Sequence, residues 1–180
     1  MNIKGQKVVL RSIEPKDLEA IREMTNDTEQ EYLIGGWSLP TAVRHQKEWY
    51  QRILVDRNNI RFAIECDDSF VGLVTLTDID WKNRRAKSGI RLTLDAPKQE
   101  GIATDALMAM LNYAFKELNL HRVYATIIEH NTPSRKLHAK CGFKEEGLLS
   151  QSIYKRGEYH NELQLSILKT EFQELKANNV

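Results

Sequence analysis

The sequence has little of what marks a membrane-spanning or secreted protein. No apolar run is long enough to span a bilayer. The N-terminus, "MNIKGQKVVLRSIEPKD", has no apolar signal-peptide core before its first charges. There are only two cysteines, Cys66 and Cys141, with neither CxxC nor disulfide-framework spacing. We therefore expect a cytoplasmic protein that meets no membrane and keeps both thiols reduced.

An excess of charge of either sign is also missing. The chain carries 26 Lys and Arg against 25 Asp and Glu, a formal net charge of +1. A dedicated nucleic-acid binder would carry a basic face that contacts several phosphates, so we expect no nucleic-acid partner. The densest basic run, "KNRRAK" at 82–87, is expected as a solvated turn between two strands.

Patterns typical of metal or nucleophile chemistry are missing as well. The five histidines show no metal-ligand spacing, so we expect no metal. Cys141 precedes Gly142 at the end of an expected helix, where a cysteine is usually a packing residue. No His–Asp partnering is visible in the sequence that would activate this thiol as a nucleophile.

What the chain does have is the composition of one globular domain. Its 180 residues are 41% hydrophobic and 28% charged, and no linker rich in Pro, Gly or Ser divides them. We expect a single domain over residues 1–180, with a short polar tail after about residue 170. The hydrophobic patterns predict an α/β protein with a mixed sheet, in the element order β α α β β β α β α β β. The central strand–helix–strand is expected as a right-handed crossover.

The expected elements follow from strand-like and helix-like periodicity and from capping residues. Thr41 is expected to cap the second helix and Thr132 the short helix near the C-terminal end, which Gly142 would end in the left-handed conformation. In chain order the elements are a strand at 7–13, helices from 15 and from 41 to about 56, strands at 60–66, 70–79 and 86–94, a helix at about 101–118, a strand at 122–128, a short helix at about 133–141, and two strands around a turn at 156–157.

Gly101 stands at the start of the long central helix, directly after a strand. A helix start carries unpaired N–H groups and a partial positive charge, and glycine lets a phosphate approach the backbone. A P-loop would need Gly-Lys-Ser/Thr, and a dinucleotide fingerprint would need G-x-G-x-x-G. Neither is present here, so the sequence predicts an anion site of another kind.

The motif "KQEGIA" at 98–103 resembles the Arg/Gln-x-x-Gly-x-Gly/Ala motif with which the GNAT superfamily of acyl-CoA N-acyltransferases binds the pyrophosphate of coenzyme A. A second stretch, "EHNTPSRKLHAKCGF", is similar to the family's later signature of an Asn, a helix and Gly-Phe. From residue 78 to 147 the chain is similar to the bacterial ribosomal-protein N-terminal acetyltransferases and to the spermidine N-acetyltransferases. Two departures stand out, because Lys98 replaces the usual Arg or Gln and Glu100 puts an acid where a basic residue or Gln is common.

The resemblance implies a GNAT fold, with a mostly antiparallel mixed sheet, and acetyl-CoA as the acyl donor. Backbone groups of the strand at 86–94 would contact the pantetheine arm and the acetyl carbonyl. For Asn131 and Ser134 the alternative role is capping a helix, and for Arg135 it is a solvated helix face. The donor-binding residues implied are Ile90, Leu92, Leu94, Lys98, Gln99, Gly101, Ile102, Ala103, Thr104, Asn131, Ser134 and Arg135.

Transfer from a thioester to an amine needs a neutral amine and a proton for the departing thiolate. Glu129 ends a strand beside Asn131 and is the first candidate for the base, with Asp78 and Asp80 as alternatives. Many GNAT enzymes have a tyrosine four residues before the Gly of Gly-Phe, where it can protonate the thiolate. The chain has His138 there, and we predict that this imidazole is the acid.

The acceptor is expected to be an amine. In the spermidine enzymes an acid follows "RRA", whereas this chain has Lys87, and the acid-rich loop is replaced by the neutral "LIGGWSLP". We therefore rank polyamines below a protein N-terminal α-amine or another small amine. Trp37 either lines the acceptor mouth or anchors a turn. A spermidine acetyltransferase, a non-catalytic CoA-binding sensor and a homodimer are left open.

Overall fold

The computed structural model describes residues 1–36, 39–97 and 100–178, which form a sheet of strands and the helices around it. The strands are β1 (Ile3–Lys4), β2 (Val9–Arg11), β3 (Ile60–Cys66), β4 (Ser69–Asp80), β5 (Arg85–Leu92), β6 (Arg122–Ile128), β7 (Lys144–Lys155) and β8 (Glu158–Leu168). The helices are the 3-10 turn η1 (Pro15–Asp17), α1 (Leu18–Asn26), α2 (Thr28–Tyr32), α3 (Val43–Val55), α4 (Ile102–Lys116), α5 (Thr132–Lys140) and α6 (Lys169–Asn178).

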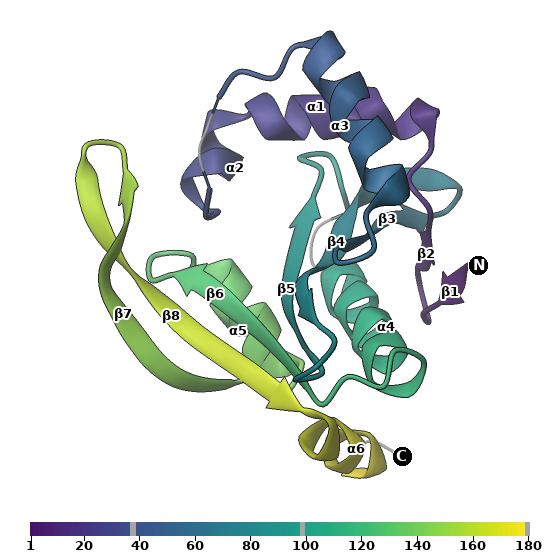
Figure 1. Cartoon of the computed structure of the whole chain (residues 1–180), viewed down its shortest axis with the longest axis vertical. Helices are drawn as coiled ribbons and strands as arrows, with labels where there is room; N and C mark the ends of the chain where they lie inside the picture. The colour runs from purple at the N-terminus through teal and green to yellow at the C-terminus, as the bar shows by residue number, and fades with distance from the viewer. Residues whose placement is uncertain (37–38, 98–99, 179–180) are drawn as a thin grey trace.

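One open sheet contains all these strands, in the order β1-β2-β3-β4-β5-β6-β8-β7 (Figure 1). Neighbouring strands are antiparallel except β5 and β6, which are parallel and joined through α4. The mixed, mostly antiparallel sheet and the predicted order of the main elements are therefore confirmed. The structure adds β1, the short α2 and α6 to the expected elements.

Adjacent residues of β3 show how the two faces of the sheet are covered. The side chains of Ala63 and Ile64 point to opposite faces because strand side chains alternate. Ile64 belongs to the main core, into which α4 packs with Leu107 among others. Ala63 packs on the other face, under α1 and α3, with Ile21 and Trp49. Helix α4 thus covers one face of the sheet, and α1 and α3 cover the other.

Two predicted helix caps lie one residue away from the real ones. The N-cap of α3 is Ala42, while Thr41 instead exchanges hydrogen bonds with the side chain of Asn26. The N-cap of α5 is Asn131, and Thr132 is the first helical residue. Helix boundaries read from sequence commonly slip by this much. Gly142 has φ +88° after α5, as predicted.

In place of the expected polar tail, the chain ends in α6. Its Phe172 is 2% exposed and packs against Phe115 of α4, with 5.2 Å between the ring centroids. The sequence does not reveal this helix because two large apolar residues, Phe172 and Leu175, in a polar stretch give too little periodic signal.

Replacing Phe172 with Ala should lower the free energy of unfolding by about 3–5 kcal/mol, the usual cost of emptying a buried aromatic site. Gln173→Ala, at an exposed neighbouring position, is the matched control and should change it by no more than about 0.5 kcal/mol. Urea unfolding of both variants measures the difference. Equal stability of the two would mean that α6 does not pack on the domain in solution.

Candidate functional site

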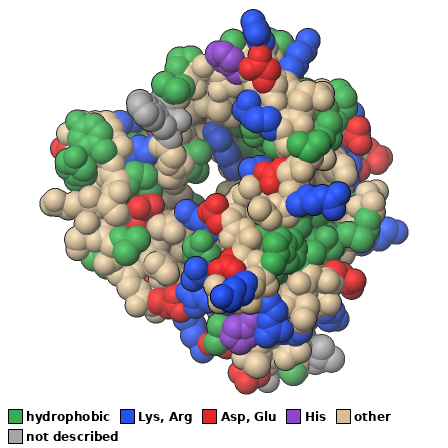
Figure 2. Space-filling view, in the orientation of Figure 1, with side chains coloured by type: hydrophobic (Ala, Val, Ile, Leu, Met, Phe, Trp, Pro, Cys, Tyr) green, Lys and Arg blue, Asp and Glu red, His purple; other side chains and the backbone are tan. Residues whose placement is uncertain are grey.

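The candidate site lies where β5 and β6 part. In the described residues the two strands pair only from Arg85↔Arg122 to Lys87↔Tyr124, although β5 continues to Leu92 and β6 to Ile128. Past the last pair, the facing strand edges carry N–H and C=O groups that need another partner. In the orientation of Figure 1 the molecule is hollowed near its centre, beside the lobe formed by β7 and β8 (Figure 2).

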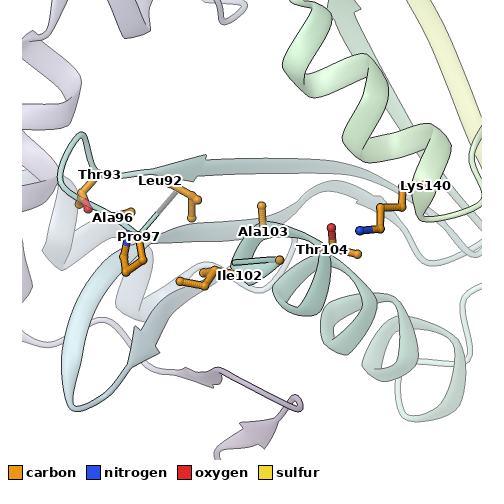
Figure 3. A pocket seen from close by; sticks show the side chains of 9 residues that line it. Leu92, Thr93, Ala96, Pro97, Ile102, Ala103, Thr104 and Lys140 are labelled. Carbon is orange, nitrogen blue, oxygen red and sulfur yellow. The ribbon is translucent and has the colours of Figure 1, made fainter. Parts of the chain in front are cut away.

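A cavity of about 430 Å³ lies at the start of α4 (Figure 3). It is bounded by the end of β5, the first turn of α4 and the last residue of α5. The residues that line it are Leu92, Thr93, Ala96, Pro97, Gly101, Ile102, Ala103, Thr104 and Lys140. Five of the predicted donor-binding residues therefore meet at one cavity, namely Leu92, Gly101, Ile102, Ala103 and Thr104.

Gly101 is the N-cap of α4 and adopts the left-handed conformation, with φ +78°. Among the described residues, a Cβ at this position would meet only the Nζ atom of Lys7, 3.9 Å away, so there the backbone angle rather than crowding favours glycine. Among the described residues no side chain caps this end of α4. The first N–H groups of α4 therefore lie open beside the cavity, as an anion site requires.

Two lysines bring positive charge to this helix start. Lys140 lines the cavity from the C-terminal end of α5. Lys7 donates from Nζ to the carbonyl oxygen of Glu100 at 2.5 Å, while the Glu100 side chain is exposed. Neither lysine was part of the sequence prediction. Lys7 could not be found in that way, because the chain brings it here through the Asp105 carboxylate, which accepts backbone N–H bonds from residues 6–8.

The other predicted donor-binding residues do not line this cavity. Leu94 lies beyond the end of β5 and is 65% exposed, and Ile90 is half-buried against the main core. Lys98 and Gln99 lie outside the described residues.

Asn131, Ser134 and Arg135 are engaged within the protein. Asn131 caps α5 by accepting from the Ser134 N–H at 3.1 Å, and its amide donates to the Leu33 carbonyl at 2.8 Å. Arg135 pairs with Glu145 at 3.2 Å. Asn131 thus has the capping role that the sequence left open, and its bond to Leu33 also holds α5 against the residues that follow α2.

His138 is buried on α5, with 2% of its surface exposed. Its Nδ1 lies 2.9 Å from the Ser134 carbonyl oxygen, which can only accept, so this nitrogen carries the proton of the neutral ring. Nε2 is buried and has no partner among the described residues. The ring also packs edge-on against Phe143, with 4.8 Å between centroids. Burial lowers the pKa of His138, and its bond to Ser134 opposes this shift only in part.

Glu129 lies in a second cavity, of about 400 Å³, at the end of β6. The cavity is lined by Glu129, His130, Gln151, Tyr159, His160 and Asn161. The Glu129 carboxylate is exposed, and its Oε2 accepts from the Asn161 amide at 2.8 Å. The sequence singled out Glu129 but not the two histidines, because they are adjacent only through the pairing of β6 with β8.

The alternative bases Asp78 and Asp80 end β4, near the closed end of the β5–β6 opening. Hydrogen bonds from Asn83 and the nearby charge of Arg85 hold the pKa of Asp80 below its usual range. This carboxylate thus stabilises the turn to β5. Asp78 is exposed and has φ +52°.

The short helix α2 reaches both sides of the opening. Toward β5, the Gln30 amide donates to the Leu92 carbonyl at 3.3 Å and its Oε1 accepts from Arg91 at 2.6 Å. On the other side, the ring of Tyr32 stacks on His130, which follows β6, and the Lys155 ammonium at the end of β7 pairs with the Glu31 carboxylate. The residues after α2 include Trp37, which lies outside the described residues.

Cysteine and metal chemistry find no support at this site. Burial raises the pKa of the Cys141 thiol to about 12, which makes it a packing residue. Within 1–36, 39–97 and 100–178, no three His, Cys, Asp or Glu residues are grouped as metal ligands. None of the helices in these ranges has the length and apolar character needed to cross a bilayer.

Known proteins resemble the whole of this arrangement. The family described as "Acetyltransferase (GNAT) domain" matches residues 7–144. The chain is 30% identical to the putative ribosomal N-acetyltransferase YdaF of Bacillus subtilis, over 94% of this chain and 95% of that protein. It is 27% identical to the spermidine N(1)-acetyltransferase of Escherichia coli K12, over 93% and 89%.

Among solved structures, the fold matches that of the Vibrio cholerae spermidine N-acetyltransferase in complex with CoA and spermine. The TM-score is 0.87 at 26% identity, over 93% of this chain and 98% of that one. A family match over most of the chain, the parted parallel strands and the uncapped glycine at the start of α4 agree with one another. The chain belongs to the GNAT acetyltransferase family and is an N-acetyltransferase.

Proposed function

We propose that the chain moves an acetyl group from acetyl-CoA directly to a primary amine, either a protein N-terminal α-amine or a small-molecule amine, in a ternary complex. The observation that carries this proposal is the cavity joining the parted end of β5 to the uncapped start of α4. Helix amides bind phosphate, and an open strand edge offers hydrogen bonds to the amides of a pantetheine arm. The Vibrio cholerae neighbour was solved with CoA, which supports this donor.

In this proposal the pyrophosphate lies against the first turn of α4. The amides of Ile102, Ala103 and Thr104 would donate to it, and Lys140 and Lys7 would add charge. Lys98 and Gln99, together with Asn131, Ser134 and Arg135, are proposed as further donor contacts. The strand edge at Ile90, Leu92 and Leu94 is proposed for the pantetheine arm.

Gly101→Val should weaken CoA binding about 10-fold or more, because a β-branched residue at positive φ shifts the amides that face the phosphate. Gly157→Val is the matched control, since Gly157 also has positive φ with open space around it but lies in the turn between β7 and β8. Both variants should lose about 1–2 kcal/mol of stability. Calorimetry that finds wild-type CoA affinity in folded Gly101→Val would refute the pyrophosphate assignment.

The charges near α2 favour an acceptor with one amine over a polyamine. The two acids of α2 are each held by a cation, because Glu29 pairs with Arg156 at 2.5 Å and Glu31 pairs with buried Lys155. A polyamine needs carboxylates that are free to bind its ammonium groups. On β5, Lys87 adds a positive charge near the opening. The relatives named for spermidine support the polyamine alternative, so spermidine is the competing substrate in the test.

A panel of amines and short peptides, assayed with acetyl-CoA by release of free thiol, should show spermidine at least about 10-fold below the best α-amine or small amine in kcat/KM. Arg156→Gln, which frees the Glu29 carboxylate, should reduce this difference in kcat/KM between spermidine and the best amine. Spermidine turnover above every other amine would reverse the ranking. If the protein binds CoA but releases no thiol from acetyl-CoA with any amine, the result would favour the non-catalytic CoA-binding sensor.

Two side chains are candidates for proton transfer. Glu129, at the end of β6, is the sequence candidate for the base that keeps the amine neutral, and His138 is proposed as the acid that protonates the departing thiolate. Since Nδ1 of His138 is bonded to the Ser134 carbonyl, the donated proton would leave from Nε2. This requires the charged imidazolium, which burial disfavours and which is consumed each time it acts.

His138→Ala should lower kcat by about 10- to 1000-fold, with acetyl-CoA affinity little changed and His138→Tyr restoring much of the rate. The protonated fraction of His138 falls as pH rises, and because burial lowers its pKa this fall occurs at lower pH than for an exposed imidazole. The ratio of wild-type to His138→Ala kcat should therefore be largest at low pH and shrink toward pH 9. A wild-type rate in His138→Ala across pH 6–9 would show that another group is the acid.

A further inference from the structure

Three rings meet at the end of β6 on the side that faces α2. The ring of His130 stacks on Tyr32 of α2, with 4.3 Å between centroids and 16° between planes. His160 of β8 meets the edges of both, at 5.0 Å from His130 and 5.9 Å from Tyr32. The guanidinium of Arg156 lies 4.1 Å from the Tyr32 ring centroid. Both histidines line the cavity of about 400 Å³ that also contains Glu129.

The hydrogen bonds of the two histidines define which nitrogen carries the proton. Nε2 of His130 lies 3.2 Å from the Tyr32 carbonyl oxygen, and Nε2 of His160 lies 3.3 Å from the Lys155 carbonyl oxygen. A carbonyl oxygen only accepts, so each neutral ring carries its proton on Nε2. Nδ1 of each ring then holds a lone pair, which is the form that a general base needs.

The order of the strands indicates which of the two histidines lies nearer to the opening between β5 and β6. β6 borders the opening, whereas β8 lies one strand farther from it. His130 directly follows β6 and precedes Asn131, the cap of α5, so it stands at the mouth of the opening. Stacking on Tyr32 and the bond to the Tyr32 carbonyl fix its plane. Glu129 lies nearby, but carboxylates as a class are weaker bases than imidazole and one of its oxygens is held by Asn161.

We propose that Nδ1 of His130 accepts the proton that the acceptor ammonium must lose before it attacks, an inference that rests on the proposed function. One proton moves from R–NH₃⁺ to Nδ1, and the amine lone pair then forms the C–N bond to the thioester carbonyl carbon. The C–S bond breaks, the second proton of the attacking nitrogen ends on the thiolate as CoA–SH, and the imidazolium returns its proton to water. Atoms and charge balance without any further reactant.

The charged and titratable groups that face His130 come from each neighbouring element. They are Tyr32 from α2, His160 from β8 and Glu129 from the end of β6, while Arg156, from the turn between β7 and β8, lies over the Tyr32 ring. Because several such groups lie close together, the contribution of His130 to the pH profile must be measured with variants that change one residue at a time.

The test is the pH profile of kcat/KM for the best amine of the panel. His130→Gln keeps a side-chain N–H for the Tyr32 carbonyl but removes the basic nitrogen. It should lower kcat/KM for the amine by about 10- to 1000-fold, remove the low-pH limb of the profile and leave the KM for acetyl-CoA unchanged. His121→Gln, at the exposed opposite end of β6, should match the wild type. Added imidazole should restore part of the activity of His130→Ala.

Several results would overturn the inference. One is a wild-type rate and profile in His130→Gln. Another is a loss of about 10- to 1000-fold in kcat/KM in Glu129→Gln or His160→Gln while His130→Gln keeps the wild-type value. In the free protein, ¹⁵N NMR should find the neutral His130 proton on Nε2, and a proton on Nδ1 would exclude this base without any assay. A wild-type protein that releases no thiol with any amine would remove the proposed function as well, whereas a fast His130→Gln variant removes this inference alone.

Discussion

The parting of β5 and β6 is the feature on which the site depends. Two parallel strands that stop pairing after three residue pairs leave backbone donors and acceptors facing each other across an open gap. Such groups must be satisfied by something other than the sheet. The protein supplies one partner itself, because Gln30 of α2 binds the Leu92 carbonyl. In the proposed function the rest of this edge receives an extended ligand, and the uncapped start of α4 beside it receives the charge at the end of that ligand.

Helix α2 contacts the sheet on both sides of this gap. The helix has five residues and none of them is buried, so it cannot be held by an apolar core of its own. It is held instead by polar contacts to both halves of the sheet. Gln30 contacts β5, and Glu31 and Tyr32 contact the β6–β8 half. Contacts of this short helix therefore reach both β5, the strand proposed to bind the donor, and the half of the sheet that contains β6 to β8.

Patterns in the sequence predicted those features of the site and fold that depend on residues close together in the chain. The period of α4, the glycine at its start and Gly142 after α5 all lie within a few residues of the structure that they specify. The sequence missed what depends on distant contacts. Lys7 reaches the start of α4 only because a hairpin docks on Asp105. Likewise α6 packs through Phe172 against Phe115 of α4, and its Glu171 pairs with Lys144 of β7, contacts between residues far apart in the sequence.

His130 and His138 show most clearly why residue type alone could not assign the site. Nδ1 of His138 donates to a carbonyl one turn back on its own helix, and its Nε2 is buried without a partner among the described residues. His130 follows a strand, donates from Nε2 to a carbonyl of α2, and lines a cavity. The same side chain therefore has opposite tautomers in two backbone settings eight positions apart along the sequence. Enzymes can separate acid from base by such differences of environment, and the acid and base roles proposed for these two rings rest on the backbone carbonyl that each one meets.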